Sequence, residues 1–294
     1  MHTTSSFRLI QEFPFWDSHE YSYSELDRLF VKSDLIGIYS HIVGIIKQEL
    51  LDIEDISWLD IGSGDGTTIA RTVDILLNHS TTHRKVRLDC IEPQKSILPA
   101  LKRNIQLSRA ELRDVVISGA ADASLLNKYD VITVIHSSYY FGKTENDFRN
   151  TWTKLLHALS PHGIIIVITL PEYSPFFYFA QPSTYISWSK GRAIVSSLCS
   201  YLQHLSVHHV SMRLATSNII SDDLEQTLRN LTLLYQFAHH DTNKLVTASD
   251  LSVLKGQLLA TCIRDREWGP VVDFNDWVIW GKGFELKTNY RTVQ

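Results

Sequence analysis

The sequence predicts an α/β protein with a doubly wound, mostly parallel sheet. Two observations support this fold class. Short apolar runs of strand length alternate with longer segments in which apolar residues recur every three or four positions, as on one face of a helix. The first such run, 58–61, leads at once into a turn with three glycines and then into a helical pattern over 69–77. This order of elements is typical of the first unit of such a sheet.

The N-terminal part of the chain precedes that turn. Apolar residues at helical spacing predict two helices, at about 24–32 and 34–51. We assign residues 1–51 to a helical segment that lies over the substrate site. Asp34 has two interpretations of about equal weight: it is the N-cap of the second helix, a role that Ser33 could also fill, or it contacts the substrate.

The glycine turn reads DIGSGDG, with glycines at 62, 64 and 66. A Cβ at these positions would oppose positive φ and keep a ligand away from the backbone. The N–H groups at the start of the next helix favour a ligand with negative or polar oxygen atoms. A dinucleotide fingerprint, G-x-G-x-x-G, would need a third glycine where the sequence has Thr67. The turn therefore favours another nucleotide cofactor, and a tight turn without a ligand is the alternative.

Strands and helices then alternate through residue 170, and we assign 52–170 to a cofactor-binding core. The predicted strands are 58–61, 86–91, 115–118, 129–135 and 163–170, and helices are predicted at 69–77, 94–107 and 151–159. The fourth strand, YDVITVI, is apolar almost throughout, as expected of a central strand buried on both faces.

Polar residues follow the carboxyl ends of these strands, where ligands bind in a doubly wound sheet. Glu92 ends the second strand, at the place of the acid that binds ribose hydroxyls. His136 follows the fourth strand, together with Tyr139 and Tyr140. The two tyrosines could wall a flat or cationic substrate, because aromatic faces attract cations. The alternative is that one of them belongs to the core.

The second half of the chain is predicted to form a substrate-side insertion, 171–260. Its first segment, 171–188, is densely aromatic and includes Phe177. This segment could cap the pocket and supply an apolar wall, or it could be ordinary packing of a subdomain. After it we expect a helix at 192–205, a sixth strand at 207–218, a helix at 222–239 capped by Asp222, and a helix at 249–262 capped by Ser249. Residues 261–294 complete the sheet through a single strand at 271–280.

Composition limits the classes of function. The chain has 294 residues, 44% hydrophobic and 20% charged, with a net charge of −4, which argues against a nucleic-acid-binding surface. Three widely spaced cysteines predict neither a disulfide framework nor a zinc site, and the 13 histidines show no metal-binding pattern. No signal-peptide pattern and no membrane-spanning run is evident. We therefore expect a cytoplasmic monomer that acts on a small molecule, without nucleic-acid, membrane or metal partners.

Taken together, DIGSGDG and the strand-terminal Glu92 resemble class I S-adenosylmethionine-dependent methyltransferases over about residues 55–170. The resemblance implies a seven-stranded Rossmann-like sheet whose last strand is an antiparallel edge strand beside the sixth. It also implies S-adenosylmethionine as the cofactor. In this class a polar residue after the third strand commonly binds the adenine amino group, and Asp122 is the candidate here, with a helix N-cap as the alternative. The cofactor-binding candidates are Asp60, Gly62, Ser63, Gly64, Gly66, Glu92, Asp122 and His136.

The segment HSSYYFGK at 136–143, with Glu92-Pro93, is similar to the histamine N-methyltransferase family of small-molecule enzymes. That family has glutamine in place of His136 and asparagine in place of Asp276, and an acid on its N-terminal helix, nearest to Asp34, binds the amine. The resemblance implies N-methylation of an amine or imidazole, with His136 as a general base or a cofactor contact. The catalytic candidates are His136, Asp276 and Tyr139, and the substrate-binding candidates are Asp34, Tyr139, Tyr140, Phe177 and Asp276.

Two other functions are compatible with the same cofactor half. An O-methyltransferase acting on a carboxylate or a phenol is one, although a carboxylate substrate would favour Arg or Lys near His136 or Asp276. A catalytically silent binding module is the other, although such a module would commonly have a damaged glycine turn, and here the turn is intact.

Overall fold

The computed structural model describes residues 28–50, 53–78, 85–125, 127–138, 141, 145–170, 205–239 and 246–282. A seven-stranded sheet forms its centre, in the order β3-β2-β1-β4-β5-β10-β6. The strands are β1 (Asp55–Ile61), β2 (Lys85–Ile91), β3 (Glu111–Val116), β4 (Tyr129–Ile135), β5 (Leu159–Thr169), β6 (Leu205–Val210) and β10 (Asp276–Lys282). The first five are parallel, and β10 runs antiparallel to both β5 and β6. The predicted doubly wound sheet with an antiparallel last strand is confirmed.

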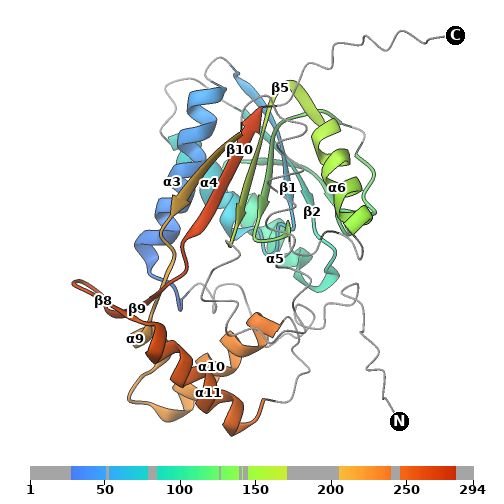
Figure 1. Cartoon of the computed structure of the whole chain (residues 1–294). Helices are drawn as coiled ribbons and strands as arrows, with labels where there is room; N and C mark the ends of the chain where they lie inside the picture. The colour runs from blue at the N-terminus through green and yellow to red at the C-terminus, as the bar shows by residue number, and fades with distance from the viewer. Residues whose placement is uncertain are drawn as a thin grey trace, which may run out of the picture.

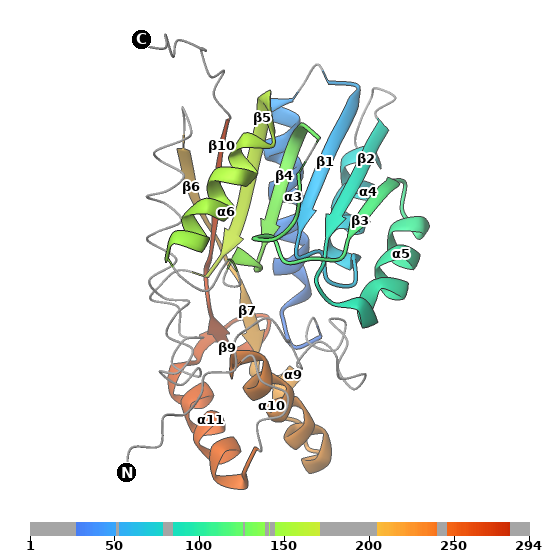
Figure 2. The same ribbon diagram turned by 90° about the vertical axis from the view of Figure 1, so that its right-hand side faces the viewer.

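Helices cover both faces of this sheet (Figures 1 and 2). The helices α3 (Lys32–Glu49), α4 (Thr67–Asn78) and α5 (Leu98–Leu107) pack on one face, and α6 (Glu145–His157) packs on the other. The stripe Ile69, Val73, Leu76 of α4 is buried against the sheet, and Phe148 and Trp152 of α6 fill the opposite layer. Burial of each such side chain contributes about 1.5–3 kcal/mol, so the amphipathic patterns fix the two layers.

The last strand differs from its prediction in two ways. It lies inside the sheet between β5 and β6, so that β6 and not the last strand forms this edge. The predicted single strand 271–280 is also divided into β9 (Gly269–Asp273) and β10 by Phe274 and Asn275. Asn275 has a φ of 45°, which ends one strand and redirects the chain into the next.

Strand β9 belongs to a second sheet, which has three strands. Its order is β7-β9-β8, with β7 (Arg213–Ala215) and β8 (Ile263–Asp265) both antiparallel to β9. The predicted sixth strand 207–218 is therefore wrong in its second half, because β6 ends at Val210 and α9 (Thr216–Ile219) follows β7. With α10 (Leu224–His239) and α11 (Ala248–Thr261), this sheet lies beyond the carboxyl ends of the parallel strands (Figures 1 and 2).

The helix boundaries correct several predicted caps. Helix α3 follows Val31, which makes no side-chain cap bond, so neither Ser33 nor Asp34 is its N-cap. Helix α10 is preceded by Asp223, whose Oδ1 accepts from the backbone N–H groups of Glu225 and Gln226 at 2.9 and 3.3 Å, in place of Asp222.

Two further stretches near helices also differ from prediction. Helix α11 is capped not by Ser249 but by Thr247, which forms a capping box with Asp250. Residues 28–31, expected in a helix, form a turn and a bridge from Phe30 to Leu214. The predicted helix 192–205 and the aromatic segment 171–188 lie outside the described residues except for Leu205. Within the described residues, no helix is long and apolar enough to cross a membrane.

Candidate functional site

The glycine turn lies between β1 and α4, at the position where the strand order reverses between β1 and β4. Gly62, Gly64 and Gly66 have φ values of 69°, 56° and 76°, a region that side chains oppose. A Cβ on Gly62 would overlap the Cβ of Ser137, and a Cβ on Gly66 would lie 2.7 Å from Cδ1 of Leu101. The turn is thus pressed between the end of β4 and helix α5, and each glycine is required by conformation.

Glu92 joins the turn to the end of β2. Its side chain is almost completely buried, at 5% exposure. The backbone N–H of Gly64 donates to Oε2 at 2.8 Å, and that of Gln94 donates to Oε1 at 3.0 Å. Burial raises the pKa of Glu92 to about 7; the two backbone hydrogen bonds oppose this shift, and the nearby Asp60 adds to it. Sequence reasoning placed Glu92 at this strand end, and the structure adds that its carboxyl group bridges two loops.

Asp60 is a second buried carboxyl group at the same place. Thr133 on the adjacent strand donates its hydroxyl to Asp60 Oδ1 at 2.6 Å, and Trp58 Nε1 donates to the Thr133 oxygen at 2.9 Å. Burial raises the pKa of Asp60 to about 6, although the Thr133 and Ser63 hydrogen bonds oppose it. Two neighbouring carboxyl groups with raised pKa values favour a ligand that donates hydrogen bonds or carries positive charge.

His136 and Asp276 come together at the end of β4 and the start of β10. His136 Nε2 lies 3.1 Å from Asp276 Oδ2, and Asp276 is 0% exposed. At the same time neither oxygen of Asp276 receives a hydrogen bond within the described part of the chain. The pair is therefore a close contact without an aligned hydrogen bond, because a hydrogen bond needs a suitable donor angle as well as a short distance. A buried carboxylate with no hydrogen bond is costly, so Asp276 has acceptor capacity for a further group.

The backbone of His136 is also unusual. It has a φ of 49°, in the left-handed region, and its N–H donates to Ile168 O at 2.9 Å. Non-glycine residues in this conformation are uncommon and cluster at functional sites. The bond to β5 fixes the residue where the fourth strand ends.

Asp34 has a different environment from the one a substrate contact requires. Arg213 donates to it through Nη2 at 2.9 Å, Nε at 3.0 Å and its backbone N–H at 3.1 Å. Arg213 also pairs with Asp265 at 2.8 Å. The carboxylate of Asp34 therefore fastens α3 to the small sheet, which favours a structural role over amine binding.

The remaining candidates are Ser63 in the glycine turn, Asp122 in the loop after β3, and three aromatic residues. Ser63 donates its hydroxyl to the backbone oxygen of Asp60 at 3.1 Å. Asp122 is exposed, in a turn where the N–H groups of Asp122 and Ala123 both donate to Gly119 O at 3.0 Å. Tyr139, Tyr140 and Phe177 lie outside the described residues.

Three residues of this region were missed by sequence reasoning. Thr133 holds Asp60, and the signal for it was a hydroxyl inside a mostly apolar strand. Ser137 donates to Ile61 O at 2.6 Å, and the hydroxyl of Ser138 is buried with no hydrogen bond in the described residues. Both serines stand directly after His136, where the sequence indicated polar character without individual roles.

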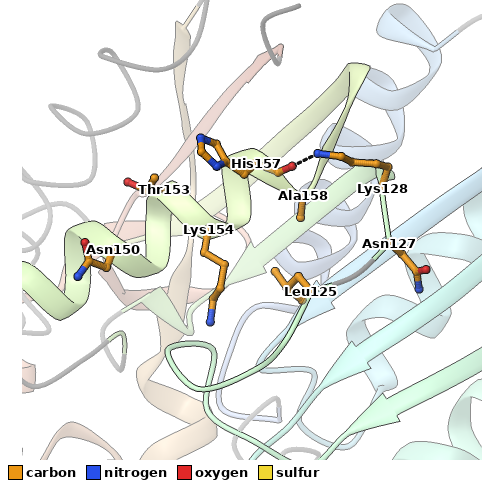
Figure 3. Close-up of a pocket in the computed structure, with 8 residues that line it drawn as sticks. All are labelled: Leu125, Asn127, Lys128, Asn150, Thr153, Lys154, His157 and Ala158. Atoms are coloured by element: carbon orange, nitrogen blue, oxygen red, sulfur yellow. Dashed lines mark hydrogen bonds between the residues drawn. The ribbon is translucent and has the colours of Figure 1, made fainter. Parts of the chain in front are cut away.

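A further cavity of about 350 Å³ lies between α6 and the loop that precedes β4 (Figure 3). It is lined by Leu125, Asn127, Lys128, Asn150, Thr153, Lys154, His157 and Ala158. None of these is a predicted site residue. Among the described residues, no group of three or more His, Cys, Asp and Glu side chains is arranged to hold a metal ion.

No protein-family model matches the sequence, and no curated protein sequence does either. Solved structures give similarities in fold. The YcgJ protein of Bacillus subtilis is 13% identical, with a TM-score of 0.51, and the match covers 84% of this chain and 99% of that one. The seven-stranded order and this match decide the fold. The chain has the Rossmann-like methyltransferase fold.

Two further structures are similar at lower TM-scores. The N-methyltransferase NodS of Bradyrhizobium japonicum WM9 is 10% identical over 84% of this chain and 96% of that one, with a TM-score of 0.48. The plantazolicin methyltransferase BpumL, solved with S-adenosylhomocysteine, is 13% identical over 92% and 89%, with a TM-score of 0.46. At these identities the likeness concerns the fold alone. The finer resemblance to the histamine N-methyltransferase family is not confirmed.

Proposed function

We propose that this protein is an S-adenosylmethionine-dependent methyltransferase that N-methylates a small molecule bearing an amine or imidazole. The observation that carries the proposal is the glycine turn fastened to buried Glu92 at the switch point of a methyltransferase-type sheet. This is where a doubly wound sheet binds its ligand.

The residues present fit that cofactor. Each Glu92 oxygen accepts one backbone N–H and retains a lone pair, so the carboxylate can accept ribose hydroxyls as well. Burial raises the pKa of both Glu92 and Asp60, so a ligand that donates hydrogen bonds or carries positive charge beside them would stabilise their charged forms. When bound, S-adenosylmethionine supplies a methyl carbon already activated by the sulfonium. The chain therefore mainly has to hold an acceptor in line with that carbon and keep water away.

The acceptor side of the proposal rests on Asp276 and His136. A substrate N–H, or a cationic nitrogen, would satisfy the carboxylate oxygens of Asp276 that receive no hydrogen bond in the described structure. His136 stands beside it, and a neutral imidazole there can take the proton of an acceptor nitrogen that arrives protonated. Asp276 would hold the substrate and stabilise the charged imidazole.

Carboxylate O-methylation has less support. Arg213, a basic residue paired in register with Asp273, has its guanidinium bound by Asp34 and Asp265. A substrate carboxylate would have to compete with two protein carboxylates for it. The buried acid at 276 would in addition repel a negative substrate.

The test is transfer of labelled methyl from S-adenosylmethionine to a panel of small amines and imidazoles, with carboxylates and phenols included for comparison. We expect turnover with at least one amine or imidazole and none with carboxylates. Turnover confined to carboxylates or phenols would replace N-methylation by O-methylation. Calorimetry that showed binding of NADH and no binding of S-adenosylmethionine would overturn the whole assignment.

A further inference from the structure

Lys154 of α6 is a half-buried cation that the proposed function does not use. Its ammonium donates to the backbone oxygen of Ala121 at 2.7 Å and to that of Ala123 at 2.8 Å. These two carbonyl groups stand on either side of Asp122 in the chain. Figure 3 shows the side chain extending from the helix toward the loop that carries Leu125. One cation thus links α6 to both flanks of Asp122.

The two lysines that line this cavity make different contacts. Lys128 donates to the backbone oxygen of His157, at the C-terminal end of α6, where helix carbonyls commonly bind cations. Lys154 lies in the last turn of the same helix, yet its ammonium reaches into the loop and not to the end of its own helix. Burial lowers the pKa of Lys154, and the charge of Asp122 opposes that shift. What distinguishes Lys154 from Lys128 is that its ammonium bonds two backbone oxygens of one loop.

The loop around Asp122 is otherwise held by the buried side chain of Ala123 and by bonds to one oxygen. Its own hydrogen bonds run from the N–H groups of Asp122 and Ala123 to a single oxygen, that of Gly119. The side chain of Asp122 is exposed. Without Lys154, the carbonyl groups on both sides of Asp122 would turn to water, and the loop would lose two of the bonds that orient it.

We propose that Lys154 is a positioning residue for adenine recognition, because it holds the backbone on both sides of Asp122 so that its carboxylate faces the adenine amino group. This inference rests on the proposed function, since it requires an S-adenosyl ligand. Fixing the loop before binding lowers the entropy cost of ordering it with the ligand. A plain tether between helix and loop would instead change stability and affect all ligands alike.

The experiment compares two ligands by calorimetry, S-adenosylhomocysteine and S-inosylhomocysteine, which presents an oxygen where adenine has its amino group. The parent should prefer the adenosyl ligand about tenfold or more, because a carboxylate facing an oxygen acceptor leaves both unsatisfied. Lys154→Met should raise Kd for the adenosyl ligand by about five- to tenfold and that for the inosyl ligand by less than about twofold, the size of one lost hydrogen bond. Lys154→Arg, which also carries several donors, should keep most of the preference.

Lys128→Met is the matched control, because it removes a lysine of the same cavity that bonds the C-terminal end of α6 and not the carbonyl groups beside Asp122, and it should leave both affinities unchanged. In an Asp122→Ala background, Lys154→Met should have no further effect on the adenosyl ligand, since the two residues would act as one unit. If Lys154→Met does not fold, Lys154→Gln, whose shorter and uncharged side chain still carries an NH2 donor group, should give an intermediate preference.

Three outcomes would overturn the inference while leaving the methyltransferase proposal intact: a parent that binds both ligands equally, a Lys154→Met variant that weakens both ligands to the same extent, or effects that add in the Asp122→Ala background. A parent that binds neither ligand would instead remove the proposed function itself, and this inference with it.

Discussion

The two halves of the candidate site differ in how completely their buried polar groups are satisfied. On the cofactor side, both oxygens of Glu92 accept backbone N–H groups and Asp60 accepts the Thr133 hydroxyl. On the acceptor side, Asp276 is equally buried and receives no hydrogen bond within the described residues. The comparison teaches that the cofactor side is built by the protein itself, whereas the acceptor side has binding capacity to spare. Affinity for the cofactor and turnover of the acceptor should therefore be separable by mutation.

The largest expected effect is on the acceptor side. Asp276→Asn should leave folding and S-adenosylmethionine affinity intact. It should lower kcat/KM for the acceptor by a factor equivalent to roughly 2–5 kcal/mol of transition-state free energy, the cost of losing one partner of a buried charged contact. The measurement is steady-state kinetics with the acceptor found in the panel, with cofactor Kd from calorimetry. Weakened cofactor binding would show that cofactor affinity and acceptor turnover cannot be separated by mutation.

A second effect follows from burial of the two carboxyl groups on the cofactor side. The pKa of Glu92 is raised from 4.5 to about 7, so the native state binds more protons than the unfolded state between these values. The contribution of Glu92 to the free energy of unfolding should therefore be greatest below pH 4.5. It should fall by roughly 3 kcal/mol as the pH rises through 7.

Urea unfolding of the parent and of Glu92→Gln between pH 4.5 and 8 measures that difference. The decline should be smaller in the variant, and what remains should include the part from Asp60, whose pKa is raised from 3.8 to about 6 and which therefore loses its contribution by pH 6 to 7. If the free energy of unfolding depended on pH identically in the two proteins, folding would not raise the pKa of Glu92.

Cofactor affinity should depend on Glu92 with a somewhat smaller effect. Glu92→Ala should weaken S-adenosylmethionine binding by roughly 1.5–3 kcal/mol, the worth of hydrogen bonds to a charged group. The control is Glu111→Ala, which removes an exposed glutamate at the N-terminal end of β3. It should leave the affinity for S-adenosylmethionine unchanged. Calorimetry that gave the same Kd for Glu92→Ala and the parent would remove Glu92 from the cofactor site.

The smallest expected effect concerns the support beneath the turn. Ser137→Ala removes the hydrogen bond from the Ser137 hydroxyl to Ile61 O and should lower the free energy of unfolding by about 0.5–1.5 kcal/mol. Because the Ser137 Cβ, which packs against Gly62, remains, cofactor affinity should change little. A large loss of affinity at unchanged stability would mean that this hydroxyl contacts the ligand.

Local patterns predicted the elements around the glycine turn well. The strand, turn and helix around Gly62 are adjacent in sequence, and Glu92 follows a strand whose apolar run is easily recognised, so no long-range information was needed. The parallel sheet followed from the same alternation. The placement of β10 between β5 and β6, by contrast, depends on how distant segments pair, which periodicity along the chain does not contain.

The errors also have physical causes. Asp34 was compatible with a cap or a substrate contact, and what decided its environment was Arg213, far along the sequence. The division of the last strand depends on a left-handed Asn275, a residue type that tolerates this conformation without requiring it. The polar groups Thr133 and Ser137 gained their roles only when β4 was placed beside β1.

The central claim is that His136 and Asp276 form one acceptor site, and a double-mutant cycle on kcat/KM tests it most directly. His136→Gln, Asp276→Asn and the double variant would be compared with the parent on the same acceptor, with S-adenosylmethionine affinity measured alongside. Residues in contact should couple by about 0.5–3 kcal/mol, so we expect the double variant to lose clearly less than the sum of the two single losses. Strict additivity, or an Asp276→Asn enzyme as active as the parent, would contradict the account and leave only the cofactor side standing.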